Sequence, residues 1–399
     1  MTFEEALRFL YPRTGDGGTK WSLGPTRELL SCLGDPQQHY PAIHVGGTNG
    51  KGSVCVLLAE ALSAAGHRVG LYTSPHLVTV RERMVINGTP ISEDAFAMWA
   101  SQLEGAVVAT GASFFEATTA IALADFAARG VDLAVVEVGL GGRLDSTNVV
   151  DSLVSAVTGV ALEHTDYLGP SLDGIAREKA GIAKSGRPFL IGERDSALVQ
   201  LMEQVAVDAG AIVRRIPPDE KYAGPLRLRG THQRRNAAVA SHVLRALPPE
   251  WRPDDAQMAA GFARAWLPGR LDRRGKWVFD VAHNPSGLSA LLAGLQEEPL
   301  PRPLHALVGI LGDKQWLDML AAVSGAVDRL WVTLPPSTPP GRAWSLDDVR
   351  QSFPNATVES DFAAALEGVQ RGGATMLVTG SFHTVGDAMA RLPGFAPLG

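Results

Sequence analysis

The sequence predicts an α/β protein with a doubly wound, mostly parallel sheet and a second, smaller α/β domain. Apolar runs of strand length alternate with helical patterns along almost the whole chain, which is typical of βαβ units. A glycine-rich loop at positions 46–53 joins the first of these runs to a long helical pattern. The alternation is interrupted at Leu267-Pro268-Gly269 and then restarts, so we expect one domain over residues 1–267 and another over residues 268–399.

The composition narrows the class of protein. Of 399 residues, 45% are hydrophobic and 20% are charged, and the formal net charge of −6 argues against a nucleic-acid or anionic membrane surface. The chain opens with acidic rather than basic residues, unlike a signal peptide, and no apolar run approaches the ~20 residues of a membrane span. Its two cysteines, Cys32 and Cys55, suggest no disulfide or metal framework. We therefore expect a cytoplasmic monomer that acts on small molecules, with no nucleic-acid or membrane partner.

The elements of the first domain follow from its apolar periodicity. Predicted strands are Ala42–Val45, Arg68–Tyr72, Leu133–Val136 and Val154–Val160, and predicted helices are Ser53–Ala65 and Ala117–Ala128. Gly66 directly follows the first helical pattern and Gly130 lies close to the end of the second, as glycines do at many helix ends. Because crossover connections between parallel strands are right-handed, this order predicts a doubly wound sheet.

The second domain repeats the alternation on a smaller scale. Its predicted strands are Trp277–Val281, His305–Leu311, Leu330–Leu334 and Thr375–Thr379, with helices between them. We therefore expect a Rossmann-like α/β domain at the C-terminal end of the sequence.

The loop at 46–53 is predicted to bind phosphate. Its glycines permit close approach, N–H groups at the start of a helix attract anions, and Lys51 adds a point charge. Val45 stands where an ordinary P-loop has its first glycine, and Gly52 separates Lys51 from Ser53. The loop is therefore a variant P-loop, and the first sheet is predicted to be of the P-loop type. In this interpretation Lys51 contacts the β- and γ-phosphates and Ser53 lies close to Mg²⁺. The alternative is a glycine turn with a solvated lysine.

Polar residues also follow other predicted strands, namely Ser74, Glu137 and His164. Carboxyl ends of parallel strands meet at one edge of a sheet, where ligands bind. A buried glutamate requires a cation, so Glu137 is expected to face a metal ion or, as the alternative, an arginine such as Arg143.

The string Gly47-Thr48-Asn49-Gly50-Lys51-Gly52-Ser53 resembles the nucleotide loop of folylpolyglutamate synthases and dihydrofolate synthases, which share a superfamily with the Mur peptide ligases. Three later segments match that family in order and context. They are His232-Gln233-Arg234-Arg235-Asn236, Pro268-Gly269-Arg270 and Asp280-Val281-Ala282-His283-Asn284-Pro285. The resemblance extends from Ser22 to Val385 and implies a first domain like the Mur ligase central domain, which binds ATP and folate. It also implies that the second domain closes over ATP and binds glutamate.

The resemblance implies a set of site residues. ATP would contact Asn49, Gly50, Lys51, Gly52, Ser53, Asn236, Arg270 and Asp280, and two Mg²⁺ ions would be held by Ser53, Ser74, Glu137 and His164. Catalysis would depend on Lys51, Lys179, His164 and His283, with Lys179 carbamylated, because magnesium ions repel an ammonium group and attract a carbamate. The substrates would contact Ser22, Leu23, Gly24, Phe115, Glu116, Thr119, Leu144, Asp145, Ser146 and Ser381. Ser22 replaces an aspartate common in the family, and Asp145 is a candidate to compensate for it.

Some alternatives stay open at the level of single residues. Lys179 could be an exposed helix lysine paired with Glu178 or Asp173. Phe114 and Phe115 could stack on a flat heterocycle or pack in the core. The glycines at 139–142 suggest a dinucleotide site, but no helix opens at the third glycine, which disfavours an oxidoreductase.

The activity that the resemblance implies is an ATP-dependent amide ligation. The γ-phosphoryl group would pass to a carboxylate, and the amine of L-glutamate would attack the acyl phosphate. The carboxylate would belong to dihydropteroate or to a folate, and we expect both to be used. A Mur-type ligase is the alternative, although no separate domain precedes the loop at 46–53. A P-loop switch or binding module would need an ordinary Walker A and a guanine-reading motif, and neither is found.

Overall fold

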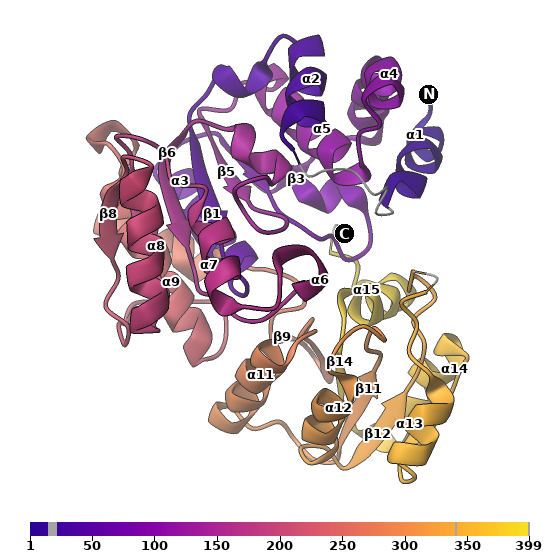
Figure 1. Cartoon of the computed structure of the whole chain (residues 1–399). Helices are drawn as coiled ribbons and strands as arrows, with labels where there is room; N and C mark the ends of the chain where they lie inside the picture. The colour runs from indigo at the N-terminus through magenta and orange to yellow at the C-terminus, as the bar shows by residue number, and fades with distance from the viewer. Residues whose placement is uncertain (15–21, 340, 398–399) are drawn as a thin grey trace. The chain divides into compact units, whose positions relative to one another are not determined.

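The computed structural model describes residues 1–14, 22–339 and 341–397, and the chain forms two compact units (Figure 1). The larger unit comprises Met1–Pro75, Val80–Arg227 and Arg234–Ala265, and the smaller one comprises His76–Thr79, Leu228–Gln233 and Trp266–Gly399. The chain passes for the last time from the larger to the smaller unit after Ala265, two residues before the boundary at residue 267 that the sequence predicts. Two short segments from before that division belong to the smaller unit.

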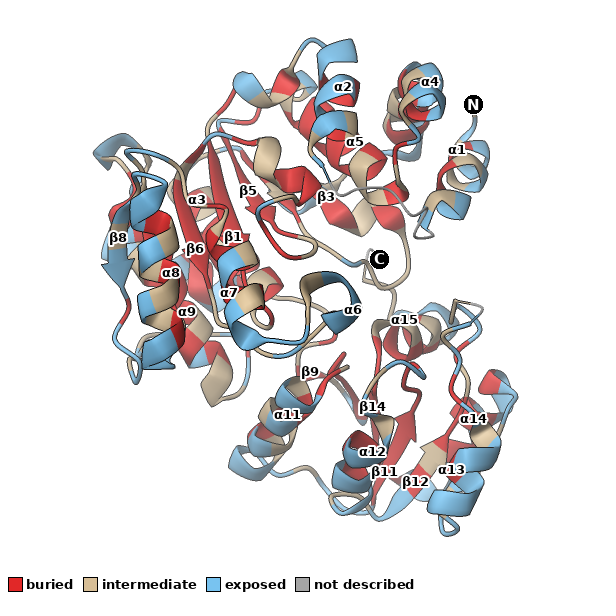
Figure 2. Ribbon diagram, viewed as in Figure 1, coloured by how far each residue is buried: buried red, intermediate tan, exposed pale blue. Residues whose placement is uncertain are grey.

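An eight-stranded sheet organises the larger unit, in the order β4-β3-β2-β5-β1-β6-β7-β8. Its strands are β1 Ala42–Gly46, β2 Val69–Tyr72, β3 Met84–Ile86, β4 Thr89–Pro90, β5 Leu133–Glu137, β6 Ser152–Val157, β7 Pro188–Ile191 and β8 Ile212–Arg215. All neighbours pair in parallel except β2 with β3 and β3 with β4. Every residue of β1 and β5 is buried, which explains why these central strands are continuous apolar runs (Figure 2). The predicted doubly wound sheet is confirmed.

Helices cover both faces of this sheet. They are α1 Phe3–Leu10, α2 Gly24–Cys32, α3 Lys51–Ala64, α4 Glu93–Thr110, α5 Phe114–Ala128, α6 Thr165–Leu168, α7 Leu172–Ala180, α8 Ser196–Asp208, α9 Thr231–Ala246 and α10 Asp255–Arg264. The helix α3 is buried along almost its whole length, and α10 packs so closely on it that a Cβ on Gly261 would lie 2.4 Å from the Cα of Ala61. No helix in the described ranges is long and apolar enough to cross a membrane.

The smaller unit is a second α/β layer structure, as predicted. Its six strands follow the order β13-β12-β11-β14-β10-β9, and only β9 is antiparallel to its neighbour. They are β9 Asp272–Arg274, β10 Trp277–Phe279, β11 Leu304–Val308, β12 Arg329–Val332, β13 Thr357–Val358 and β14 Thr375–Thr379. The helices are α11 Pro285–Glu297, α12 Trp316–Ser324, α13 Leu346–Ser352, α14 Phe362–Val369 and α15 Phe382–Arg391. All residues of β11 and β14 are buried between two apolar clusters.

Candidate active site

The chain passes from β1 into α3 through a loop whose backbone only glycine adopts easily. Gly47 has φ +135° and Gly50 has φ +87°, and no side chain caps the helix that begins at Lys51. A Cβ on Gly50 would lie 2.5 Å from Oδ1 of Asn236, so α9 brings this amide directly against the loop. The first N–H groups of α3 therefore have no capping side chain and can bind an anion, which fits the predicted phosphate site.

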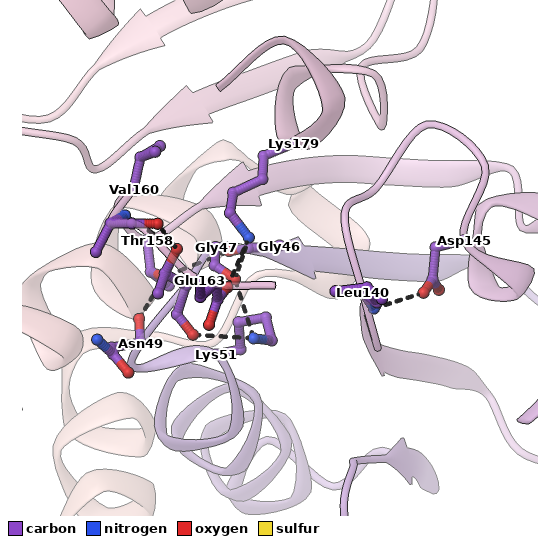
Figure 3. Close-up of polar contacts among 12 residues, drawn as sticks. Gly46, Gly47, Asn49, Lys51, Leu140, Asp145, Thr158, Val160, Glu163 and Lys179 are labelled. Atoms are coloured by element: carbon purple, nitrogen blue, oxygen red, sulfur yellow. Dashed lines mark hydrogen bonds and ion pairs between the residues drawn. The ribbon is translucent and has the colours of Figure 1, made fainter. Parts of the chain in front are cut away.

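Residues that the sequence analysis missed hold this loop in shape (Figure 3). The hydroxyl of Thr158 donates to the carbonyl of Asn49 at 2.7 Å, and the N–H of Thr48 donates to the carbonyl of Gly159 at 2.8 Å. The N–H of Ala161 donates to the hydroxyl of Thr48 at 3.0 Å. The segment after β6 thus replaces sheet pairing by bonds to the loop, and β6 ends at Val157 rather than at the predicted residue 160.

Two lysines converge on one carbonyl oxygen. The ammonium groups of Lys51 and Lys179 each donate to the oxygen of Gly47 at 2.9 Å, and Lys51 also donates to the carbonyl of Thr48 at 3.0 Å. Lys179 is 1% exposed and pairs with Glu163 at 3.1 Å (Figure 3), so the alternative of an exposed lysine paired within its own helix is wrong. Burial lowers the pKa of Lys179 to about 8, and the charge of Lys51 contributes, although Glu163 opposes the shift.

Glu137 is the last residue of β5 and is buried. Its Oε2 accepts a hydrogen bond from the N–H of Ser74 at 3.0 Å, so the structure brings these two predicted metal ligands together. Arg143 pairs instead with Glu178 at 2.8 Å, so it is not the partner of Glu137. The alternative of an arginine near Glu137 stays open through Arg83, whose pKa is lowered by burial and raised in part by the charge of Glu137. Ser53 lies buried in the first turn of α3.

This donor set fits a magnesium ion bound together with phosphate. No group of three His, Cys, Asp or Glu side chains suited to a metal occurs in the described part of the chain. Mg²⁺ commonly takes only one or two protein carboxylates and completes its shell with water and substrate phosphates. A single buried carboxylate near an anion-binding loop meets that requirement. It would not suffice for a metal site whose ligands all come from the protein.

His164 occupies a position that differs from the prediction. We expected it at the end of a strand, but β6 ends earlier, at Val157, and His164 is the N-cap of the short helix α6 with φ +48°. The reason is the diversion of residues 158–161 to the phosphate loop. His164 still follows directly on Glu163, whose pKa is lowered by Lys51, Lys179 and His164 against the effect of burial.

The segments predicted to hold substrate carry structural bonds of their own. The hydroxyl of Ser22 accepts from the N–H of Gly24 at 3.3 Å, and Leu23 is the N-cap of α2. The carboxylate of Glu116 accepts from the N–H of Ser113 at 2.7 Å in a capping box at the start of α5. Thr119 is buried, and its hydroxyl donates to the carbonyl of Phe115 and lies 3.0 Å from the hydroxyl of Tyr72.

The two adjacent phenylalanines differ in their surroundings. Phe114 is a core residue, because its ring stacks on Tyr11 with centroids 5.2 Å apart and lies 5.2 Å from the guanidinium of Arg83. Phe115 is half-buried, and its ring lies so close to Gly139 that a Cβ there would approach it to 2.3 Å.

The glycines at 139–142 therefore serve close packing. A Cβ on Gly142 would lie 2.6 Å from the carbonyl oxygen of Glu178, in the helix that carries Lys179. The dinucleotide interpretation finds no support in this arrangement, because the glycines admit side chains and a helix of the protein itself.

Asp145 is buried and shapes the same segment. Its carboxylate accepts hydrogen bonds from the N–H of Leu140 at 2.7 Å, from the N–H of Thr147 at 3.0 Å and from the hydroxyl of Thr147. Burial raises its pKa, and these donors oppose the shift. Leu144 is half-buried and Ser146 is buried beside it.

In the smaller unit, Arg270, Asp280 and His283 gather around the turn before α11. Asp280 is buried and accepts from the N–H groups of Leu271 and Ala282 at 2.8 and 2.9 Å. Burial raises the pKa of Asp280 to about 6 against the charge of Arg270. The ring of Phe382 lies 5.2 Å from the guanidinium of Arg270 and 5.5 Å from the ring of His283.

Ser381, a predicted substrate contact, caps a helix of the same unit. It is buried, and its hydroxyl accepts from the N–H of Thr384 at 3.1 Å at the start of α15. This bond fixes the segment that carries Phe382.

Comparison with known proteins agrees with this geometry. Residues 269–382 match the family described as Mur ligase, glutamate ligase domain. The phosphate loop of the larger unit and this match in the smaller one define the class, which is the ATP-dependent ligases with Mur ligase architecture. The dihydrofolate synthase/folylpolyglutamate synthase of Escherichia coli K12 is 35% identical, over 86% of this chain and 85% of that protein. The chain belongs to the folylpolyglutamate synthase/dihydrofolate synthase family.

Other relatives agree in sequence and in structure. The Mycobacterium tuberculosis dihydrofolate synthase/folylpolyglutamate synthase is 36% identical, over 78% of this chain and 74% of that protein. The structure of E. coli FolC in complex with DHPP and ADP has a TM-score of 0.87 and 32% identity, over 98% of this chain and 97% of that one. The Yersinia pestis bifunctional enzyme with AMPPNP and Mn has a TM-score of 0.86 and 33% identity, over 98% of both chains. This chain spans 52% of a Halobacterium salinarum relative named a probable bifunctional folylpolyglutamate synthase/dihydropteroate synthase.

Proposed function

We propose that this protein ligates L-glutamate to the carboxylate of a folate or of dihydropteroate, with ATP as the energy source. The γ-phosphoryl group of ATP passes to the substrate carboxylate and ADP leaves. The amine of glutamate then attacks the acyl carbon and forms an amide bond. The bond between the acyl carbon and the phosphate oxygen breaks, and phosphate leaves with its electron pair. The relatives named as folate enzymes support this choice of substrates over a Mur-type precursor.

The observation that carries the proposal is the loop at Gly47–Lys51, with its uncapped helix start and two ammonium groups on one carbonyl oxygen. Two cations held this close repel each other, and an anion placed between them relieves the repulsion. Phosphoryl transfer asks the protein chiefly for positioning and charge neutralisation, and this loop offers both.

The chain's own residues have separable tasks in this proposal. Lys51 leaves the carbonyl oxygens of Gly47 and Thr48 and takes the β- and γ-phosphates, while the N–H groups of α3 bind the remaining phosphate oxygens. Asn236, against Gly50, contacts the nucleotide. From the smaller unit, Arg270 and Asp280 are assigned to ATP and His283 to catalysis, and that unit is also assigned the binding of glutamate.

Magnesium is the proposed metal. Ser53, Ser74, Glu137 and His164 would hold it, as one or two ions, together with the phosphates of ATP. When bound, it neutralises charge that develops on the transferring phosphoryl group. The Mn ion in the Yersinia pestis enzyme supports a divalent metal at such a site.

Lys179 is proposed to be carbamylated in the active enzyme. Its pKa of about 8 lies below the ordinary 10.5 and so increases the uncharged fraction of the amine near neutral pH, and only the uncharged amine reacts with CO₂. In that reaction a nitrogen–carbon bond forms and one proton is released to solvent. The product brings a negative charge toward the metal ions, where the ammonium would bring a positive one.

The direct test offers purified protein ATP, Mg²⁺ and labelled L-glutamate with tetrahydrofolate or dihydropteroate. We expect label in the folate fraction and stoichiometric release of ADP and phosphate. Lys51→Ala should lower turnover by orders of magnitude at saturating ATP, because the point charge beside the phosphates is lost. Lys276→Ala is the matched control, because the ammonium group of Lys276 donates to the carbonyl of Gly373, away from the loop. Incorporation with a nucleotide-linked muramic acid substrate instead would assign the protein to the Mur-type ligases.

A further inference from the structure

A buried carboxylate closes the segment 139–147 of the larger unit on itself. Asp145 accepts hydrogen bonds from the N–H of Leu140 at 2.7 Å, from the N–H of Thr147 at 3.0 Å and from the Thr147 hydroxyl. Figure 3 shows the bond to Leu140. Because the donors come from both ends of the segment, one charge fixes the loop that carries Leu144 and Ser146.

The hydroxyl of Thr147 extends this bonding to β1. Nε2 of His44 lies 2.8 Å from Oγ1 of Thr147, and both side chains are fully buried. Thr147 has one hydroxyl proton and donates it to Asp145, so Nε2 of His44 must carry a proton and donate it to Thr147. Burial lowers the pKa of His44 to about 3, so the imidazole is neutral near pH 7 and its single proton is the one on Nε2.

A histidine is costly at this position of the sheet. All residues of β1 are buried, and Nδ1 of His44 is buried without a hydrogen-bond partner among the described residues. An apolar side chain such as that of Ile43 or Val45 would avoid the cost of an unsatisfied buried acceptor. The polar residue is thus placed where only its bond to Thr147 offsets that cost.

The strand itself is a fixed reference for the phosphate loop. β1 pairs in parallel with β5 on one side and β6 on the other, and the loop begins at Gly47, directly after its last residue. A bond from the middle of β1 to the segment 139–147 therefore relates that segment to the loop through rigid backbone.

We propose that His44 and Thr147 form a positioning pair that sets the substrate segment 139–147 relative to the phosphate loop. The pair would thereby fix how the substrate carboxylate meets the γ-phosphate. This inference rests on the proposed function, because it assumes that the segment 139–147 holds the folate. Both side chains are fully buried, so the role assigned to each is to act through Asp145 and the loop that it closes.

The test compares steady-state kinetics and melting temperatures of the full-length protein and its variants. Thr147→Val removes the hydroxyl at nearly constant shape, Thr147→Ser retains it, and His44→Leu removes the imidazole while leaving the Thr147–Asp145 bond. Ser152→Ala is the control, because Ser152 is equally buried and its hydroxyl bonds at 2.7 Å to Ser155, outside the segment.

We expect His44→Leu and Thr147→Val to raise the KM for tetrahydrofolate at least tenfold and to change the KM for ATP less than twofold. Thr147→Ser should restore the wild-type KM. The double variant should be no worse than Thr147→Val alone, because Thr147→Val already removes the bond that His44→Leu breaks. Ser152→Ala should lower the melting temperature and leave both KM values unchanged.

Other outcomes overturn the inference. If His44→Leu behaves like Ser152→Ala, the pair contributes only to folding, and an equal rise in both KM values means a general loosening of the site. If Thr147→Val does not fold, His44→Leu alone decides. If the wild-type protein ligates no glutamate to any folate, the proposed function fails and the inference with it. If the wild-type protein is active and the variants keep its KM values, the inference is refuted and the proposed function stands.

Discussion

At the scale of single residues, the charges around Gly47 decide what the site can bind. Its carbonyl oxygen accepts from Lys51 and Lys179, and the carboxylate of Glu163 is the nearest counter-charge to Lys179. The protein thus holds an excess of positive charge beside an uncapped helix start. Such an arrangement favours a polyanion such as the triphosphate of ATP.

Glu137→Gln should raise the Mg²⁺ concentration needed for half-maximal activity steeply. The substitution removes a full negative charge from the proposed metal site and keeps the shape of the side chain. A Mg²⁺ titration of activity measures the effect, with Glu178→Gln as a control that removes only the partner of Arg143. A variant that melts earlier but keeps its Mg²⁺ dependence would mean that Glu137 has a structural role alone.

Lys179→Ala should be nearly inactive and should regain part of its activity with a short carboxylic acid such as acetate. The alanine leaves a vacancy in a buried position, and a small carboxylate there can replace the anionic oxygens of a carbamate. Activity is measured against acetate concentration, with chloride at equal ionic strength as the control. Rescue by methylamine in place of acetate would show that the ammonium form of Lys179 is the active one.

His44 should make the protein less stable in acid. Its folded-state pKa of about 3, lowered by burial and by the charge of Lys184, lies below the ordinary 6.5. Between these values the unfolded chain binds a proton that the folded chain excludes, so stability falls as the pH falls from 6.5, by at most ~1.4 kcal/mol per pH unit. Chemical denaturation of wild type and His44→Leu between pH 7 and pH 4 measures the difference. If both proteins lose the same stability as the pH falls, the prediction for His44 is wrong.

At the scale of elements, glycines set how closely α7 approaches the loop that follows β5. Gly142 meets the backbone of Glu178, and Gly181 meets Arg143, with a hypothetical Cβ at 2.6 and 2.4 Å from the nearest atoms. Since Lys179 lies on α7, these contacts also set the position of its side chain beside Gly47. The close packing of this helix is therefore part of the site.

Gly142→Ala should lower both stability and turnover. The added methyl group must push against the backbone of Glu178. Overpacking of this kind in a well-packed core typically lowers the free energy of unfolding by about 1–3 kcal/mol. Melting temperature and kcat are the measurements. Gly105→Ala in α4, where a Cβ meets nothing within 4 Å, should instead be neutral or slightly stabilising. Wild-type kcat in Gly142→Ala would show that α7 can shift without moving Lys179.

The elements also show what the sequence can and cannot predict. Buried parallel strands are continuous apolar runs, so β14 was predicted with the bounds that it has. The edge strand β8, Ile212–Arg215, is largely exposed and polar and leaves no such run, so it was missed. The hairpin of β3 and β4 was also missed, although Asn87-Gly88 with positive φ at both residues is a recognisable turn signal.

The site residues divide in the same way. Residues within motifs, such as Lys51 and Glu137, could be named from the sequence because their chemistry requires particular residue types at particular strand ends. Thr158, Glu163 and His44 could not, because a side chain that bonds to a distant backbone or side-chain atom has no periodicity. Only the fold shows which distant segment receives the bond.

At the scale of the whole molecule, an acidic chain must bind substrates that are themselves anionic. The formal net charge is −6, while ATP, glutamate and folates all carry negative charge at neutral pH. In the proposed function, binding therefore depends on local positive groups, which we assign to Lys51 at the loop of the larger unit and to Arg270 of the smaller one. Because exposed charges are screened within about 10 Å at 0.1 M salt, these groups rather than the net charge decide affinity.

Substrate scope is the property of the whole enzyme that the sequence leaves most open, and we expect both dihydropteroate and tetrahydrofolate to accept glutamate. The segments at Phe115 and Asp145 match the family form that uses both. Ser22 stands where the family commonly has aspartate, so we expect the pterin to bind more weakly here than in those relatives. Asp145 does not compensate, because its carboxylate is buried and already takes three hydrogen bonds from Leu140 and Thr147.

Ser22→Asp should therefore lower the KM for both substrates. One hydrogen bond to a charged group contributes roughly 1.5–3 kcal/mol, which corresponds to a change of about tenfold or more. Both substrates carry the pterin, so both KM values should fall together while the KM for ATP stays constant. Ser31→Asp on the exposed side of α2 is the control. If the wild-type protein extends tetrahydrofolate but never dihydropteroate, and Ser22→Asp does not restore that reaction, the enzyme is a folylpolyglutamate synthase alone.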